Sequence, residues 1–275
     1  MTKTFAITLL FLCSVFGSSV LGQSSIRIQG SDTLILLSQR WVQIYQQKQP
    51  QASIAVQGGG LSTAMKSLAA GRATIVQSEE VEPKAAVSLP VGVEGIAVYV
   101  HNSNPVSQLT LDQLKGIFLG EITNWKQLGG PDKRILLYAG ESSTGVLPYF
   151  QEVVLRDAEP YPFVGKASAK ELVDTVAAQP EAIGYSSIFP TNSVKTVRIK
   201  ASGSGPAVEA SIENIRTRKY PISRYVYWSL ARKPTGEMKD FCEWVLSRDG
   251  QLVVESVGFE PLTPSDRAAG LAKLR

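Results

Sequence analysis

Three short polar turns contain the residues whose types and spacing suit them to bind a small anion. They cover residues 30–33, 58–63 and 140–145, and each follows a strand-like segment and precedes a helix-like one. A polar turn at the start of a helix presents unpaired backbone N–H groups, hydroxyls and the positive end of the helix dipole. One such turn is usually only a helix cap, but three that converged on one cleft would bind a tetrahedral oxyanion.

These turns define the candidate ligand-binding residues. Their hydroxyls, acid and glycines are Ser31, Asp32, Thr33, Gly60, Ser62, Thr63, Ser142, Ser143, Thr144 and Gly145. The acids in or near the turns are Asp32, Glu79, Glu80 and Glu141. An ionised carboxylate only accepts hydrogen bonds, so it would admit protonated hydrogen phosphate and repel fully ionised sulfate. Asp32 has an alternative role as the N-cap of the helix that follows it.

The composition argues against catalysis. His101 is the single histidine and the two cysteines are Cys13 and Cys242, so a Ser-His-Asp triad and a multi-histidine zinc site are close to excluded. Carboxylates near an anion site could suggest a phosphate-ester hydrolase, but no metal-ligand cluster supports one. We expect no catalytic residue, no metal and no cofactor. The net charge of +4 does not require nucleic acid, and the basic stretch 216–224 is typical of a helix end.

Residues 1–22 have the pattern of a secretory signal peptide. Lys3 supplies the positive end, residues 4–16 are nearly all apolar, and small residues precede Gln23. The apolar run is too short to span a membrane. Cys13 could mark a lipoprotein, but Leu12 stands before it where a small residue is usual. We expect a cleaved signal peptide and a periplasmic or secreted protein.

The rest of the chain alternates between strand and helix patterns. Strands are predicted at 25–29, 52–57, 73–77, 93–100, 134–138, 182–187, 194–199 and 224–230. Helices are predicted at 33–49, 62–70, 110–118, 147–155, from 168 onward, and at 206–215, 238–245 and 251–257. This alternation indicates an α/β fold of two lobes, with mixed sheets flanked by helices. Strand passages near 97–101 and 221–227 are the candidate crossings, which would form a hinge beside a ligand cleft.

The chain resembles a known family over nearly all of its length beyond residue 22. The firmest stretch is NPV at 104–106 followed by LTLDQLKGIFLGEITNW at 109–125 and GGPD at 129–132. Further matches are AIGY at 182–185, YPISR at 220–224 and GQ at 250–251. These segments are similar to those of the phosphate-binding proteins of bacterial ABC uptake systems, which have the type 2 periplasmic-binding fold. The chain looks like a divergent member.

The resemblance implies roles for the turns. Residues 30–33 match the family's first anion turn, and residues 58–63 resemble the second, with Leu61 where a serine is common. Segment 75–80 resembles a further binding segment, which adds Ser78 and Glu80 to the candidates. The third turn departs most, because Gly140 stands where the family often has an arginine, and this loss removes a bidentate partner for phosphate.

The resemblance also implies a fold, a function and partners. Lobe one is expected to comprise residues 23–97 and 222–275, and lobe two residues 98–221. The protein is expected to be a monomer that captures inorganic phosphate or a similar oxyanion and delivers it to an ABC permease complex in the inner membrane. The alternative is a binding-fold protein with weak or no phosphate affinity that serves as a sensor, an adhesion protein or an accessory interaction protein.

Overall fold

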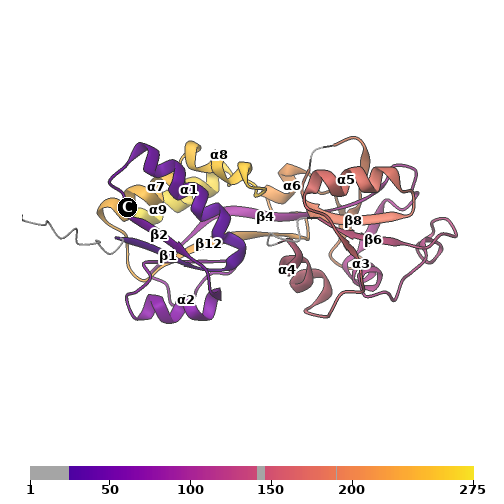
Figure 1. The fold of residues 1–275 in the computed structure, drawn as a ribbon, viewed down its shortest axis with the longest axis horizontal. Coiled ribbons are helices and arrows are strands. Elements are labelled where there is room, and N and C mark those ends of the chain that lie inside the picture. The colour runs from indigo at the N-terminus through magenta and orange to yellow at the C-terminus, as the bar shows by residue number, and fades with distance from the viewer. Residues whose placement is uncertain (1–24, 141–145, 190) are drawn as a thin grey trace, which may run out of the picture.

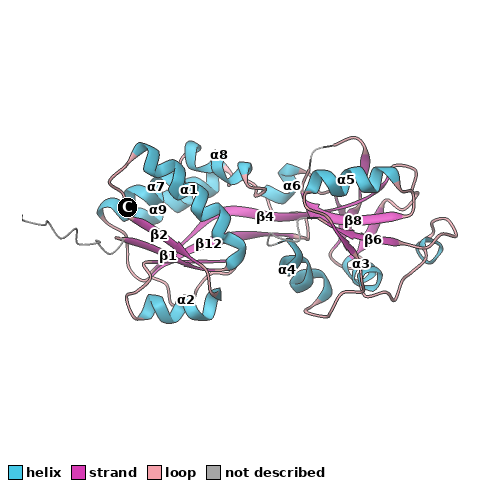
Figure 2. Ribbon diagram, in the orientation of Figure 1, coloured by secondary structure: helices cyan, strands magenta, loops and turns pink. Residues whose placement is uncertain are grey.

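The computed structural model describes residues 25–140, 146–189 and 191–275. Its elements form two lobes that lie end to end, and the long strand β4 (Val87–His101) runs from one lobe into the other beside β12 (Ser223–Leu230) (Figure 1). Helices flank the strands in both lobes (Figure 2). The expected α/β fold of two lobes with mixed sheets is therefore confirmed. The expected signal peptide lies outside the described residues.

Lobe one is built on three parallel strands in the order β2, β1, β3. They are β1 (Ile26–Gly30), β2 (Ile54–Gln57) and β3 (Ile75–Ser78). After a 3-10 turn at Asp32–Leu34, α1 (Ile35–Lys48) connects β1 to β2, and α2 (Gly60–Ala69) connects β2 to β3. Because the strands are parallel, their carboxyl ends lie at one edge of the sheet.

The C-terminal part of the chain returns to complete lobe one. β12 lies between β3 and β4 and pairs antiparallel with both. Three helices follow: α7 (Gly236–Val245), α8 (Arg248–Ser256) and α9 (Pro264–Leu274). Trp41 of α1 packs edge-on against Trp228 of β12, with ring centroids 5.2 Å apart, and its indole N–H donates to the Gly250 carbonyl at 2.7 Å. The N-terminal helix α1 and the C-terminal elements β12 and α8 therefore share one core.

Lobe two continues the same sheet through the second half of β4. Its strands are β6 (Leu136–Ala139), β7 (Val164–Gly165), β8 (Ala182–Ser187) and β9 (Val194–Thr196). Its helices are α3 (Leu111–Phe118), α4 (Val146–Phe150) with the π-helical turn Gln151–Leu155, and α5 (Ala169–Ala178). A small sheet of β5 (Gln108–Thr110), β10 (Arg198–Lys200) and β11 (Ala207–Val208) precedes α6 (Ile212–Arg216). Phe150 stacks on Tyr185 in its core, with centroids 3.6 Å apart.

Several element predictions differ from the structure. The helix predicted at 206–215 begins only at Ile212, because β11 pairs with β10 before it. The strand predicted at 194–199 is two strands, β9 and β10, which join different sheets. α9 was not predicted, although Thr263 caps it and Pro264 occupies its first turn. Arg224 lies in β12 and not at a helix end, whereas Arg216 does end α6.

No helix within the described ranges has both the length and the apolar character that a membrane crossing requires.

Candidate functional site

The first, second and 75–80 segments meet at one edge of lobe one. Residues 31–33 follow β1, residues 58–59 follow β2, and residues 79–80 follow β3. β1 pairs in parallel with both of its neighbours, with Gln29 opposite Gln57 and Gly30 opposite Gln77. The three segments therefore leave the sheet side by side.

Hydrogen bonds tie these segments to one another. The Ser31 hydroxyl donates to the Glu79 carboxylate, which joins the segment after β1 to the segment after β3. The Asp32 carboxylate accepts the Gly59 backbone N–H at 3.0 Å, which joins the first segment to the second. The buried Gln77 side-chain amide donates to the Ser31 carbonyl at 3.0 Å. This edge is therefore a linked unit of three turns, in which Asp32 fixes a neighbouring turn and makes no helix-cap hydrogen bond.

Two glycines allow the turns to approach this closely. A Cβ on Gly30, whose φ is +150°, would lie 2.0 Å from the Gln77 carbonyl oxygen. A Cβ on Gly58 would lie 2.0 Å from the Asp32 carboxylate. A side chain at Gly30 would clash with backbone and separate the segments, whereas one at Gly58 would displace the Asp32 carboxylate.

The start of α2 keeps free backbone donors at this edge, whereas in the 3-10 turn before α1 the Leu34 N–H donates to the Ser31 carbonyl and the Ile35 N–H to the Asp32 carbonyl. Neither α1 nor α2 has a side-chain cap at its N-terminus, and Gly59, the N-cap of α2, is left-handed with φ +103°. Thr33 is half-buried in the 3-10 turn, whereas Ser62 and Thr63 are exposed in the first turn of α2, directly after Gly60. Unpaired N–H groups beside hydroxyls are donors for an anion.

The structure distinguishes among the polar residues after β3. Ser78 is buried and its hydroxyl donates to the Glu80 carbonyl at 2.7 Å. Glu80 is exposed, whereas Glu79 is half-buried and bound by Ser31. The carboxylate that the structure joins to the first turn is thus Glu79, which the sequence named as an acid of interest but not among the final candidates.

The third turn follows β6 of lobe two in the chain. Its candidate residues Ser142, Ser143, Thr144 and Gly145 lie outside the described residues. Gly140, before them, is buried at the end of β6 and donates its N–H to the Tyr185 carbonyl at 2.8 Å. A Cβ there would lie 2.7 Å from the Cβ of Ser186, so a residue larger than glycine does not fit at position 140 unless its surroundings shift. α4 begins at Val146, directly after the turn.

A cluster of charges lies between the lobes, in which Glu94 and Arg224 are largely buried and Glu152 is exposed. Arg224 of β12 pairs with Glu94 of β4 through Nε at 3.0 Å and with Glu152, after α4, through Nη1 at 2.6 Å. Its guanidinium carbon lies 3.8 Å from the centre of the Tyr149 ring. Burial raises the pKa of Glu94 to about 7, against the opposing charge of Arg224. Burial lowers the pKa of Arg224, but Glu94 and the other nearby carboxylates outweigh it, and the net shift is upward. Sequence reasoning did not find this cluster, because only the strand register brings its members together.

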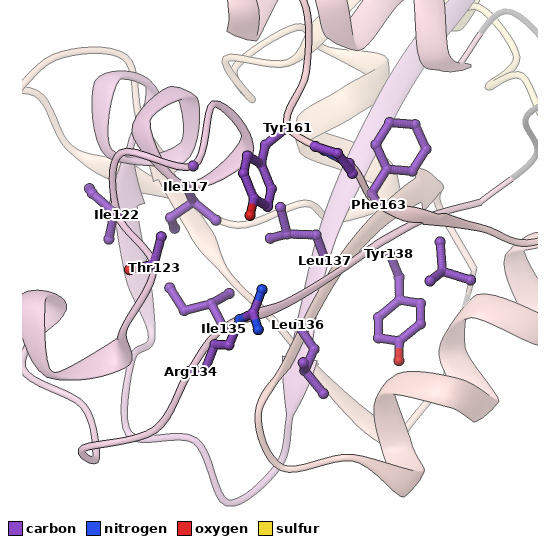
Figure 3. Close-up of a pocket in the computed structure, with 13 residues that line it drawn as sticks. Ile117, Ile122, Thr123, Arg134, Ile135, Leu136, Leu137, Tyr138, Tyr161 and Phe163 are labelled. Atoms are coloured by element: carbon purple, nitrogen blue, oxygen red, sulfur yellow. The ribbon is translucent and has the colours of Figure 1, made fainter.

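A separate, largely apolar pocket of about 270 Å³ lies in lobe two (Figure 3). Ile117, Ile135, Leu137, Tyr161 and Phe163 line it, with Arg134 among them. None of the candidate ligand-binding residues contributes to this pocket.

Comparisons with known proteins place the chain in a family. A family model described as "PBP superfamily domain" matches residues 18–249. The phosphate-binding protein PstS of Bacillus subtilis is 31% identical over 87% of this chain and 81% of its own length.

Solved structures agree with this assignment. A possible phosphate binding protein from Planctomyces limnophilus is 22% identical, with a TM-score of 0.81 over 90% of this chain and 96% of the other. An ABC-type phosphate transport receptor from Vibrio cholerae is 25% identical, with a TM-score of 0.67 over 86% of this chain and 99% of the other. The chain therefore belongs to the PstS family of phosphate-binding proteins, within the PBP superfamily.

Proposed function

We propose that this protein is an exported solute-binding protein that captures inorganic phosphate between its two lobes and delivers it to an ABC permease complex. The observation that carries the proposal is the linked edge of lobe one, where Ser31, Asp32 and Glu79 join three turns beside the uncapped start of α2 and the start of the 3-10 turn that leads into α1. Uncapped helix starts offer donors to an anion without further rearrangement. The relatives are named for phosphate binding or phosphate transport, which supports this ligand and a binding rather than a catalytic role.

The ligand would be held mainly by neutral donors. Backbone N–H groups at the starts of the 3-10 turn Asp32–Leu34 and of α2, together with the hydroxyls of Thr33, Ser62 and Thr63, would donate to phosphate oxygens. Glu79 would accept a hydrogen bond from the protonated oxygen of hydrogen phosphate, and the same carboxylate would repel sulfate. Residues 142–145 would add the donors of lobe two.

Capture would close the lobes over the ligand. Lobe one (23–97 and 222–275) and lobe two (98–221) would move about β4 and β12, and the permease would bind the closed form. A monomer that acts in the periplasm or outside the cell, after removal of residues 1–22, fits this role. No covalent bond of the ligand would be formed or broken.

Calorimetry on refolded protein that has been stripped of phosphate tests the proposal. We expect heat with phosphate, much less with sulfate, and a loss of most affinity in Thr33→Val and Ser62→Ala. Each neutral hydrogen bond contributes about 0.5–1.5 kcal/mol, and a charge-assisted one about 1.5–3 kcal/mol, so each variant should bind roughly ten- to a hundredfold more weakly.

Two variants serve as matched controls. Thr175→Val changes a half-buried threonine of α5, far along the chain from the candidate turns, and Ser265→Ala changes an exposed serine in the first turn of α9. Both should bind phosphate as the wild type does. No heat from the wild type at millimolar phosphate would reject the transport role and favour the alternative of an interaction protein.

A further inference from the structure

Arg224 and Glu94 lie just beyond the linked edge of lobe one. β12 pairs with β3 only as far as Tyr227 opposite Ser78, and it runs on past the end of β3 to Ser223. Arg224 lies in this overhanging stretch, opposite Glu94 of β4. Glu79 directly follows Ser78, and its charge contributes to raising the pKa of both Arg224 and Glu94. The guanidinium is therefore near the carboxylate that Ser31 binds.

The guanidinium is fixed from both lobes. Glu94, whose side chain is 6% exposed, holds Nε, and Tyr149 of α4 lies against the plane. Both partners are buried, and they set the position of a cation whose own side chain is 17% exposed. An arginine held in this way has little conformational freedom left to lose when it binds an anion.

Glu152 is a different kind of partner. Its carboxylate bonds Nη1 at 2.6 Å, but its side chain is 50% exposed. Because this carboxylate already reaches solvent, releasing it costs less than releasing the buried carboxylate of Glu94. A carboxylate and a phosphate present the same pair of acceptor oxygens to a guanidinium, so one can replace the other.

We propose that Arg224 is a ligand-binding residue whose guanidinium is occupied by Glu152 in the empty protein and by the oxyanion in the loaded one. This inference rests on the proposed function. Glu152 would thereby act as an internal competitor that lowers affinity, and Arg224 would supply the fixed cation of the cleft. An arginine has five N–H donors, and among the described residues two of them have a partner, so donors remain for the ligand.

The test measures phosphate affinity by calorimetry in a double-mutant cycle. Arg224→Lys keeps a cation beside Glu94 but loses the planar fork, and it should bind phosphate roughly ten- to a hundredfold more weakly. Glu152→Gln removes the competitor and should bind phosphate about two- to fivefold more tightly. In the Arg224→Lys, Glu152→Gln double variant this gain should disappear, because the gain depends on the guanidinium.

Matched controls come from the exposed ion pair between Arg156 and Asp112, which lies in lobe two with Glu152. Its charged atoms lie 2.7 Å apart. Arg156→Lys and Asp112→Asn should leave affinity unchanged. Unfolding by urea shows whether each variant is folded, and Glu152→Gln changes only an exposed carboxylate, so it tests the competition even if Arg224→Lys unfolds.

The outcomes separate the two proposals. If the wild type does not bind phosphate, the proposed function fails and this inference fails with it. If the wild type binds but Arg224→Lys binds equally well, only the role of Arg224 is rejected. A gain in Glu152→Gln that persists without the guanidinium would mean general charge repulsion and would reject the competition.

Discussion

Glu94 and Glu260 are carboxyl groups that the fold buries. Burial raises the pKa of each to about 7, although Arg224 and Arg216 respectively oppose the shift. A carboxyl group whose pKa is higher in the folded than in the unfolded protein takes up a proton on folding. Such a group favours the protonated folded state and makes stability depend on pH.

The direction in which stability changes with pH follows from these raised pKa values. Between about pH 4.5 and pH 7 the folded protein binds more protons than the unfolded one, so the free energy of unfolding should fall as pH rises through this window and level off above it. Glu260→Gln should flatten the fall, as measured by urea unfolding at half-unit steps of pH. Glu213→Gln, which changes an exposed acid of α6, should leave the profile as it is. A profile that rises between pH 5 and 7 in the wild type but not in Glu260→Gln would contradict the assignment.

At the scale of elements, the linked edge depends on close backbone approach. Gly30 has a φ of +150° and no space for a Cβ beside the Gln77 carbonyl, and its neighbour Ser31 donates its N–H to that same carbonyl at 3.0 Å. The end of β1 therefore packs directly against the end of β3, with no space for a side chain at Gly30.

Gly30→Ala should consequently destabilise the protein by about 3 kcal/mol, because the clash involves backbone that cannot move aside. Urea unfolding measures the loss. Gly203→Ala is the control, since a Cβ at Gly203 meets nothing within 4 Å and no unusual φ is needed there. Equal stability of the two variants would show that the edge can open without cost.

Elements with local signals were predictable from the sequence. The helix predicted from residue 110 begins with a capping box of Thr110 and Gln113, whose two hydrogen bonds are 3.0 and 2.9 Å long. Ser168 was likewise predicted as a helix start and accepts the Glu171 N–H. Local side-chain to backbone bonds decide such starts, and no distant residue is needed. The same signal at Thr263 could have found α9.

Features that depend on distant pairing were not predictable in this way. β4 is longer than the predicted strand because β12, more than a hundred residues later, pairs with its first half. The same register creates the pairing of Arg224 with Glu94. The anion turns were proposed from residue types alone, but the bonds from Ser31 to Glu79 and from Asp32 to Gly59 required the strand order. The ligand-binding roles of these turns remain predictions.

At the scale of the whole molecule, two strands link the lobes. Their backbones pair with each other between the lobes, so they can bend together while each lobe keeps its own core. The lobe boundaries near residues 97 and 221 remain predictions.

Because the lobes would close over the ligand by bending β4 and β12, phosphate should make the molecule more compact. Small-angle X-ray scattering should show a smaller radius of gyration with saturating phosphate than without it, and no change with sulfate. The free protein at equal ionic strength is the control. Binding seen by calorimetry without a change in scattering would retain capture but reject closure as the signal to the permease.

The place of β12 in the sheet also sets the order in which the chain can assemble. The sheet of lobe two uses only residues 96–196, so it is complete while the C-terminus is still being synthesised. Lobe one cannot finish, because β3 and β4 have no common neighbour until residues 223–230 arrive. The middle of the chain can thus mature first, and β3, although it is synthesised before that middle part, waits for β12.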